Sequence, residues 1–185
     1  MDIDVAHRYL GQVPMDALRE RILSLPLEAW QEQKMRQQVY EVHRDTESIV
    51  MLFCDESWPD GDIYREAGWD RIADVAMPLI DHIVNTYYEP GGTVLRAMAA
   101  KLKVGGRIVP HTDSLRSFEM GHRIHVPITT NPAVNFLLES KPVRFEIGSA
   151  YELNNQRRHS ASNLGKEDRI SFIFDYVPAG AISGA

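Results

Sequence analysis

The stretch "VPHTDSLRSFEMGHRIHVPI", residues 109–128, places three histidines, an aspartate and two arginines among short apolar runs. In its second half, Arg123 and His125 alternate with three apolar residues, Ile124, Val126 and Ile128. An alternation with period two predicts a strand with one apolar face toward the core and one face that carries polar groups. Both the fold and the chemistry of this chain depend on what the polar face holds.

The same period dominates the chain after "EPGG", residues 89–92. Turn residues such as "TTNP" and "NLGKED" separate short strands that we predict at 93–104, 107–110, 122–130, 133–138, 142–147, 150–153, 157–162 and 168–177. Many short strands with regular turns are typical of a sandwich or a jelly roll. The pattern therefore predicts a mainly β fold.

Helical periodicity is strong before residue 90. Apolar residues in phase predict helices at 14–25 and 70–88, with Asp70 as the cap of the second and Pro78 as a kink within it. Between them, 37–44 and 48–55 read as strands of a hairpin. We expect a single α+β domain over 1–185, in which 1–90 covers a catalytic core formed by 91–178.

Composition narrows the class of protein. The chain has 185 residues, of which 44% are hydrophobic and 25% charged, as in an ordinary globular domain. Its one cysteine, Cys54, excludes an internal disulfide and fits a reducing cytoplasm. The net charge of −6 argues against a nucleic-acid partner. We find no long apolar run or basic leader, so we expect neither a membrane span nor a secretory signal.

A candidate metal site begins with His111 and Asp113, which point to the same side of an extended segment. One imidazole and one carboxylate are two thirds of the facial triad that is typical of non-haem Fe(II) oxygenases. His159 is the best candidate for the third ligand. The alternatives are a polar role for His159 at a sheet edge and a chance His-x-Asp.

Arg169 and Ser171 share one face of a predicted strand. A guanidinium can bind both oxygens of a carboxylate, so this pair suits a carboxylate ligand. The alternative is an ion pair between Arg169 and the neighbouring Asp168 or Glu167. A joint metal site of His122 and His125 is disfavoured, because an odd offset on a strand sends the two side chains to opposite faces.

The motifs "VPHTD…RIHVPI…HSASN…DRISFIFDY" resemble the aspartyl/asparaginyl β-hydroxylase family, within the Fe(II)/2-oxoglutarate-dependent oxygenases. The resemblance covers roughly residues 94–177 and implies a double-stranded β-helix, a distorted jelly roll of cupin type. It implies that His111, Asp113 and His159 bind Fe(II) and that Arg169 and Ser171 hold the distal carboxylate of 2-oxoglutarate. Arg123 and His125 would face the metal-proximal end of this cosubstrate.

The resemblance also implies a reaction. With O2, such an enzyme hydroxylates an unactivated C–H bond of an amino acid or of an aminoacyl residue in a peptide, and it releases succinate and carbon dioxide. Some animal members have glycine at the position of Asp113, whereas bacterial relatives that act on free amino acids such as proline retain His-x-Asp. The spacing from His111 to Arg123 is longer than in those animal members, so we expect the altered segment "SLRSFEMG" beside the substrate.

Several points stay open at the level of the sequence. Arg116, Arg144 and Arg158 are candidates for binding a substrate carboxylate, with surface roles as the alternative. The rival functions are a cupin-type metal-binding protein without oxygenase activity and a metal-dependent isomerase or hydrolase on the same barrel. The sequence does not fix the substrate or the oligomeric state.

Overall fold

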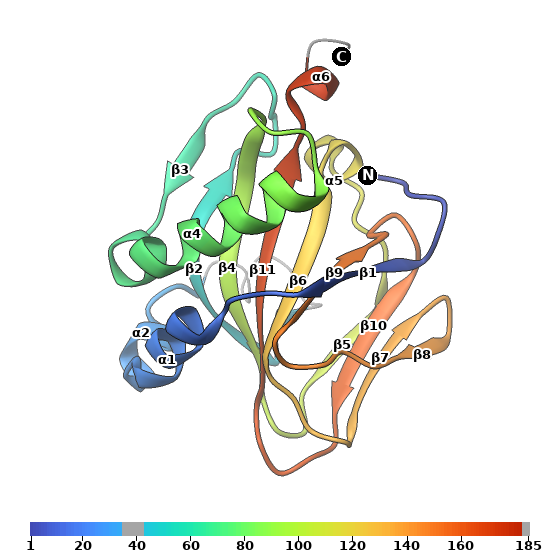
Figure 1. Cartoon of the computed structure of the whole chain (residues 1–185). Coiled ribbons are helices and arrows are strands. Elements are labelled where there is room, and N and C mark those ends of the chain that lie inside the picture. Colours follow the sequence, from blue (N-terminus) through green and yellow to red (C-terminus); the bar gives the residue numbers. More distant parts are fainter. Residues whose placement is uncertain (35–42, 183–185) are drawn as a thin grey trace.

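Two antiparallel β-sheets face each other in the computed structural model, which describes residues 1–34 and 43–182 (Figure 1). The major sheet has, in spatial order, β1 (His7–Gln12), β9 (Ser149–Leu153), β6 (His122–Thr129), β11 (Arg169–Val177), β4 (Thr93–Leu102), β2 (Thr46–Cys54) and β3 (Ile63–Arg65). The minor sheet has β5 (Arg107–His111), β10 (His159–Asn163), β7 (Val134–Leu138) and β8 (Lys141–Val143). The fold is a double-stranded β-helix, and the prediction of a mainly β jelly roll with packed helices is confirmed.

The described residues also form helices. They are α1 (Asp16–Ser24), α2 (Leu27–Gln31), α4 (Trp69–Tyr87), α5 (Arg116–Met120) and α6 (Ala179–Ile182). Figure 1 shows α4 lying across the outer face of the major sheet. Its apolar stripe is buried there, which confirms the predicted helix and its role as a cover. The predicted cap is wrong: the helix begins after Gly68 without a side-chain cap, and Asp70 lies inside the first turn.

Strand alternation divides the major sheet into two chemically different faces. On β6, Ile124 and Val126 are fully buried in the core cluster that includes the helices. On β11, Phe172 and Phe174 belong to the same cluster. Arg169 and the other β11 residues that alternate with these phenylalanines therefore point to the opposite face, toward the minor sheet. The polar face that the alternation predicts is the face between the two sheets.

Several predicted boundaries change. The strand predicted at 142–147 ends at Val143, because β8 has only β7 as a partner and pairs with it through three residues. The short strands β1 and β3, at the two edges of the major sheet, were not predicted, because neither has a clear apolar alternation. The strand predicted at 48–55 is β2, whereas most of its predicted hairpin partner at 37–44 lies outside the described residues.

No helix within the described ranges is both long enough and apolar enough to cross a membrane.

Candidate active site

A cavity of about 320 Å³ opens between the two sheets. The floor comes from the inner face of the major sheet, and the opposite wall comes from the minor sheet and the segment 111–118. Its polar lining includes every predicted site residue except Ser171: His111, Asp113, Arg123, His125, His159 and Arg169. Residues that are far apart in the sequence therefore meet in one cavity.

The two outer members of the His-x-Asp…His set are cross-strand neighbours. His111 ends β5 and pairs with His159 at the start of β10, and their ring centroids are 4.3 Å apart. Asp113 follows just beyond β5, where its backbone N–H donates to the carbonyl oxygen of Asn155 at 3.1 Å. One nitrogen or oxygen atom from each of the three side chains lies within 4.8 Å of the others. The folding of two strands and one short loop is enough to assemble the set.

The chain fixes which ring nitrogen of each histidine is free to bind. Nδ1 of His111 lies 2.8 Å from the carbonyl oxygen of Val109, and Nδ1 of His159 lies 3.0 Å from that of Arg157. Because a carbonyl only accepts, each Nδ1 carries the proton and donates it. Nε2 of both rings is then an unprotonated donor of electron pairs, as a metal ligand must be. Burial also lowers the pKa of His159, which favours its neutral form.

A buried network of charges lies beside these three residues. Nη1 of Arg123 forms an ion pair with Oδ2 of Asp113. Its Nε and Nη2 donate to the two carboxylate oxygens of Asp175 at 2.8 and 2.9 Å. Although burial alone lowers the pKa of Arg123, the two carboxylates raise it above its usual value. Arg123 is thus a fixed cation that touches a residue of the candidate triad.

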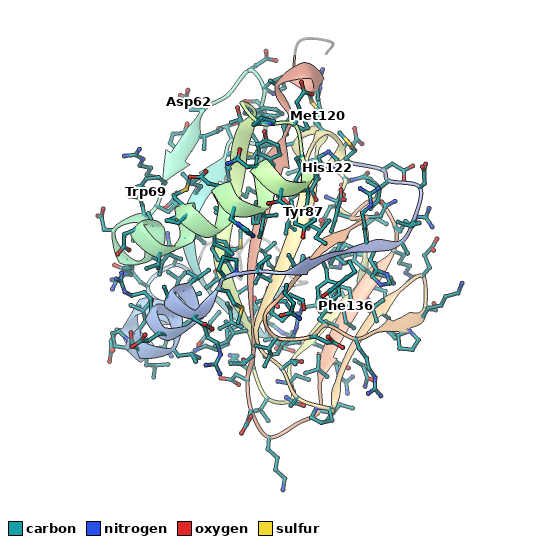
Figure 2. The ribbon with its side chains drawn as sticks, viewed as in Figure 1. Asp62, Trp69, Tyr87, Met120, His122 and Phe136 are labelled. Carbon is teal, nitrogen blue, oxygen red and sulfur yellow. The ribbon has the colours of Figure 1, made fainter. Side chains whose placement is uncertain are left out.

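At the other end of the floor, Arg169 is 5% exposed, and its Nη2 has no hydrogen-bond acceptor among the described residues. The ring of Phe136, a β7 side chain (Figure 2), lies 5.5 Å from its guanidinium carbon. Burial lowers the pKa of Arg169 to about 10, which leaves it charged at neutral pH. No ion pair to Asp168 or Glu167 forms, so the surface alternative for Arg169 does not hold.

Ser171 lies on the same face of β11, two residues beyond Arg169, as the alternation predicts. It is 1% exposed, and its Oγ has no hydrogen-bond partner among the described residues. Its cross-strand neighbour Ala100 lines the cavity, whereas Ser171 itself does not. A buried hydroxyl without a partner is costly, so this position retains capacity to bind a polar ligand.

On the cavity floor, His125 lies between the charge network of Arg123 and the end that holds Arg169. Its Nδ1 is buried without a hydrogen-bond partner among the described residues. Burial, with the charges of Arg169 and Arg123 added, lowers the pKa of His125 well below its usual value. A neutral imidazole with an unused nitrogen is therefore available to a ligand. His122 instead contacts Glu152 and does not line the cavity, which agrees with opposite faces for the two histidines.

Among the charged residues of the site, Arg96 and Asp175 were missed from the sequence. Arg96 of β4 lines the cavity and lies 3.5 Å from Asp175 of β11. Both are nearly fully buried. The available signal was a charged residue with apolar neighbours inside a strand pattern, Arg96 in "TVLRAMAAKL" and Asp175 in "SFIFDYV". The segment "SLRSFEMG" contains α5 and contributes Leu115 and Phe118 to the cavity lining.

Comparison with known proteins adds relatives of this fold. Over 101 residues the chain is 24% identical to the L-proline cis-4-hydroxylase of Rhizobium meliloti (strain 1021), a match that covers 55% of this chain and 36% of that protein. The match thus spans little more than a third of this relative.

Solved structures of low identity share the fold. A prolyl hydroxylase from Trichoplax adhaerens, in complex with a fragment of the hypoxia inducible factor oxygen degradation domain, has a TM-score of 0.58 at 13% identity, over 97% of this chain and 87% of that chain. The viral collagen prolyl hydroxylase of Paramecium Bursaria Chlorella virus-1, in complex with 2-oxoglutarate, has a TM-score of 0.54 at 9% identity, over 95% and 97%.

The family comparison covers most of the sequence. Residues 20–178 match the model of the aspartyl/asparaginyl β-hydroxylase family. This range includes both sheets apart from β1, the helices α2, α4 and α5, all of α1 except its first four residues, and every residue that lines the cavity. The chain therefore belongs to the aspartyl/asparaginyl β-hydroxylase family.

Proposed function

We propose that this protein is an Fe(II)- and 2-oxoglutarate-dependent dioxygenase that hydroxylates an amino acid or an aminoacyl residue of a peptide. The observation that carries the proposal is the meeting, in one cavity, of a His–Asp–His set with a buried arginine that has an unused N–H group. Family membership and the relative that acts on L-proline support the same class of reaction.

The three candidate ligands fit a divalent iron. Two imidazole Nε2 atoms and one carboxylate are the donor set of a facial triad, which leaves other coordination positions open. The hydrogen bonds from both Nδ1 atoms orient the rings, as expected for ligands that are held by an outer shell. The ion pair with Arg123 holds Asp113 close to His111, whose Nε2 lies 3.7 Å from Oδ1 of Asp113. In this proposal His111, Asp113 and His159 hold the metal.

Bound Fe(II) with 2-oxoglutarate supplies the oxidising chemistry that consumes O2 and yields succinate, carbon dioxide and a hydroxylated product. The protein's own contribution is to bind and orient. Arg169 binds the distal carboxylate of 2-oxoglutarate, and Ser171 donates its hydroxyl to the same group. Arg123 and His125 lie on the floor between that site and the metal ligands, where they face the proximal end. Apolar side chains such as Met98, Ile108 and Ile173 exclude water from the cavity.

The rival functions explain the metal ligands but leave Arg169 without a role. A cupin-type metal-binding protein, or an isomerase or hydrolase on the same barrel, needs the metal ligands but no second buried cation for a dicarboxylate. Arg169 is buried without an ion-pair partner in the part of the chain that the structure describes, and because such burial costs free energy, it favours a function in which an anionic ligand completes the site.

The direct test is to incubate the protein with Fe(II), 2-oxoglutarate and O2 in the presence of each of the twenty L-amino acids and a set of peptides. We expect succinate to form with one of these candidates, together with a product that has gained one oxygen atom by mass spectrometry. Omitting 2-oxoglutarate should abolish both signals. A product that forms without 2-oxoglutarate or succinate would favour the isomerase or hydrolase, and metal binding without any turnover would favour the cupin-type protein.

A further inference from the structure

Asp113 is the member of the candidate triad that no strand holds. β5 ends at His111, and residues 112–114 have no regular secondary structure. His111 and His159, by contrast, lie opposite each other in the pairing of β5 with β10. The direction in which the Asp113 carboxylate points therefore depends on contacts outside the two sheets.

One turn, residues 154–157 between β9 and β10, supplies these contacts. The carbonyl oxygen of Asn155 accepts the backbone N–H of Asp113 at 3.1 Å. Nε2 of the next residue, Gln156, donates to the carbonyl oxygen of Asp113 at 3.0 Å. Because a carbonyl only accepts, Gln156 must present the NH2 end of its amide here. The turn therefore holds both backbone polar groups of Asp113.

This pair of contacts determines the backbone conformation of Asp113. Its N–H belongs to the peptide plane before the Cα atom, and its C=O belongs to the peptide plane after it. A peptide unit is planar, so the backbone has two soft dihedrals at each residue, φ and ψ. Holding the planes on both sides of Cα restricts both dihedrals, and with them the direction of the bond from Cα to Cβ.

The same turn also orients His159 and is itself held firmly. The carbonyl oxygen of Arg157 lies 3.0 Å from Nδ1 of His159, so consecutive residues of the turn contact two members of the triad. Asn154 is fully buried, and its Oδ1 accepts the backbone N–H of Gln156 at 3.2 Å. Its Nδ2 donates to the carbonyl oxygen of Ile3 at 2.7 Å. Gln156 thus reaches Asp113 from a fixed support.

Arg123 competes with the metal for the carboxylate of Asp113. Oδ2 of Asp113 contacts Nη1 of Arg123, whereas Oδ1 lies 3.7 Å from Nε2 of His111. A guanidinium can accommodate both oxygens of a carboxylate. If the backbone of Asp113 were free to move, its carboxylate could turn both oxygens toward Arg123, and Oδ1 would leave the side of His111. A fixed backbone opposes this movement.

From these contacts we infer that Gln156 is a positioning residue, which holds the backbone of Asp113 so that Oδ1 stays directed to the metal. The inference rests on the proposed function, in which Asp113 is a metal ligand. Gln156 does not line the cavity, so it acts through Asp113 and not on a bound ligand. Removing a hydrogen-bonding partner of a metal ligand typically costs about 10- to 100-fold in metal affinity.

The test is a calorimetric titration with Ni(II) alone, which reports on the metal site without turnover. Ni(II) suits imidazole ligands and binds more tightly than Mn(II) or Fe(II), so weakened sites stay measurable. Gln156→Met keeps a side chain of similar length without the donor, and we expect it to weaken Ni(II) binding by about 10- to 100-fold. Gln156→Leu also lacks the donor and gives the same reading if the methionine variant does not fold.

Two comparisons separate positioning of Asp113 from a general effect on the fold. Gln12→Met is the matched control, because Gln12 is an exposed glutamine of β1 whose Nε2 donates to Oγ of Ser149. It should bind Ni(II) as the wild type does. In an Asp113→Ala background, His111 and His159 still bind Ni(II), but the carboxylate that Gln156 positions is absent. Gln156→Met should lose most of its effect there.

The inference is overturned if Gln156→Met and Gln156→Leu bind Ni(II) as tightly as the wild type. It is also overturned if Gln156→Met weakens Ni(II) binding by the same factor with and without the Asp113 carboxylate, because a structural role of the turn, or an effect through His159, predicts that result. In both cases the proposed function stands. If the wild type itself does not bind Ni(II), the proposed function fails together with the inference.

Discussion

At the scale of single residues, the candidate site depends on side chains whose orientation the backbone determines. Val109 and Arg157 each offer a carbonyl oxygen to a histidine two residues further along the chain, and this contact fixes the tautomer. His111 and Asp113 could be predicted from their spacing, because residues two apart on an extended segment point the same way. Arg96 and Asp175 could not, because a strand pattern does not tell which buried charges meet.

Replacing His159 tests the metal site at this scale. We expect His159→Ala to abolish succinate formation and to weaken Mn(II) binding strongly, because the set then keeps only one imidazole and one carboxylate. The fold should remain near intact, because His159 lies at the cavity and not in the apolar core. The matched control is His82→Ala, an exposed histidine of α4, which should retain activity. Full activity of His159→Ala would contradict the assignment.

Asp175 is the residue on which the charge network depends. Asp175→Asn keeps the shape but leaves Arg123 and Arg96 without their shared carboxylate, so we expect the free energy of unfolding at neutral pH to fall by about 3–5 kcal/mol. Urea unfolding would measure this. Asp81→Asn, at an exposed position of α4, should change little. A loss for Asp175→Asn no larger than that of the control would show that the network does not stabilise the fold.

The effect of Asp175 should also depend on pH. Burial alone raises a carboxyl pKa, but Arg123 and Arg96 outweigh it and hold the pKa of Asp175 below its usual range. A depressed folded-state pKa stabilises the protein above the unfolded pKa, which is about 3.9. The difference between wild type and Asp175→Asn should therefore be constant above this pH. It should shrink as the pH falls from the unfolded pKa through the folded pKa, because the unfolded chain there binds a proton that native Asp175 takes up only at lower pH.

At the scale of elements, helices and strands were predicted best where the spacing of apolar residues keeps one period over many residues. Eight apolar positions in phase identified α4, and alternation identified β4, β6 and β11. The five-residue helix α5 was missed, because one turn and a half shows no periodicity, and its position depends on contacts of Ser117 and Phe118 with Arg96. The short edge strands β1 and β3 form because a neighbouring strand offers its hydrogen bonds, which is tertiary information.

Pro78 tests how α4 is stabilised. It lies in the interior of the helix on the exposed side, where it cannot donate a hydrogen bond to the carbonyl of Asp74. Alanine at this position is better by about 3 kcal/mol in helix propensity, and the greater freedom of the unfolded chain offsets about 1 kcal/mol of this. We expect Pro78→Ala to raise the free energy of unfolding by about 1–2 kcal/mol.

The comparison for Pro78→Ala is Asn85→Ala, an exposed position of the same helix, which should gain less than about 0.7 kcal/mol from propensity alone. Thermal and urea unfolding of both variants would measure the two gains. If Pro78→Ala destabilises the protein, the packing of α4 on the major sheet requires the proline, and the helix is held by its shape more than by its hydrogen bonds.

At the scale of the whole molecule, the major sheet separates stability from function. Its outer face packs apolar residues against α1, α2 and α4, and its inner face carries the arginines and His125 of the cavity. The minor sheet supplies the two histidines and closes the cavity. The pattern of two chemically different faces is visible in the sequence of β6 and β11. The depth of the cavity and the pairing of its charges depend on how the two sheets meet, and no local pattern contains that information.

The central claim is that the cavity binds 2-oxoglutarate through Arg169, and titration of 2-oxoglutarate in the presence of Mn(II), which prevents turnover, tests it most directly. Arg169→Ala should weaken the binding of 2-oxoglutarate by about 10- to 150-fold, while Mn(II) binding stays almost unchanged. Arg169→Lys should recover only part of the affinity, because its point charge lacks the planar geometry of the guanidinium. The control is Arg144→Ala, which removes an exposed arginine that does not line the cavity and should bind 2-oxoglutarate as the wild type does. Equal affinities of wild type and Arg169→Ala for 2-oxoglutarate would contradict the account.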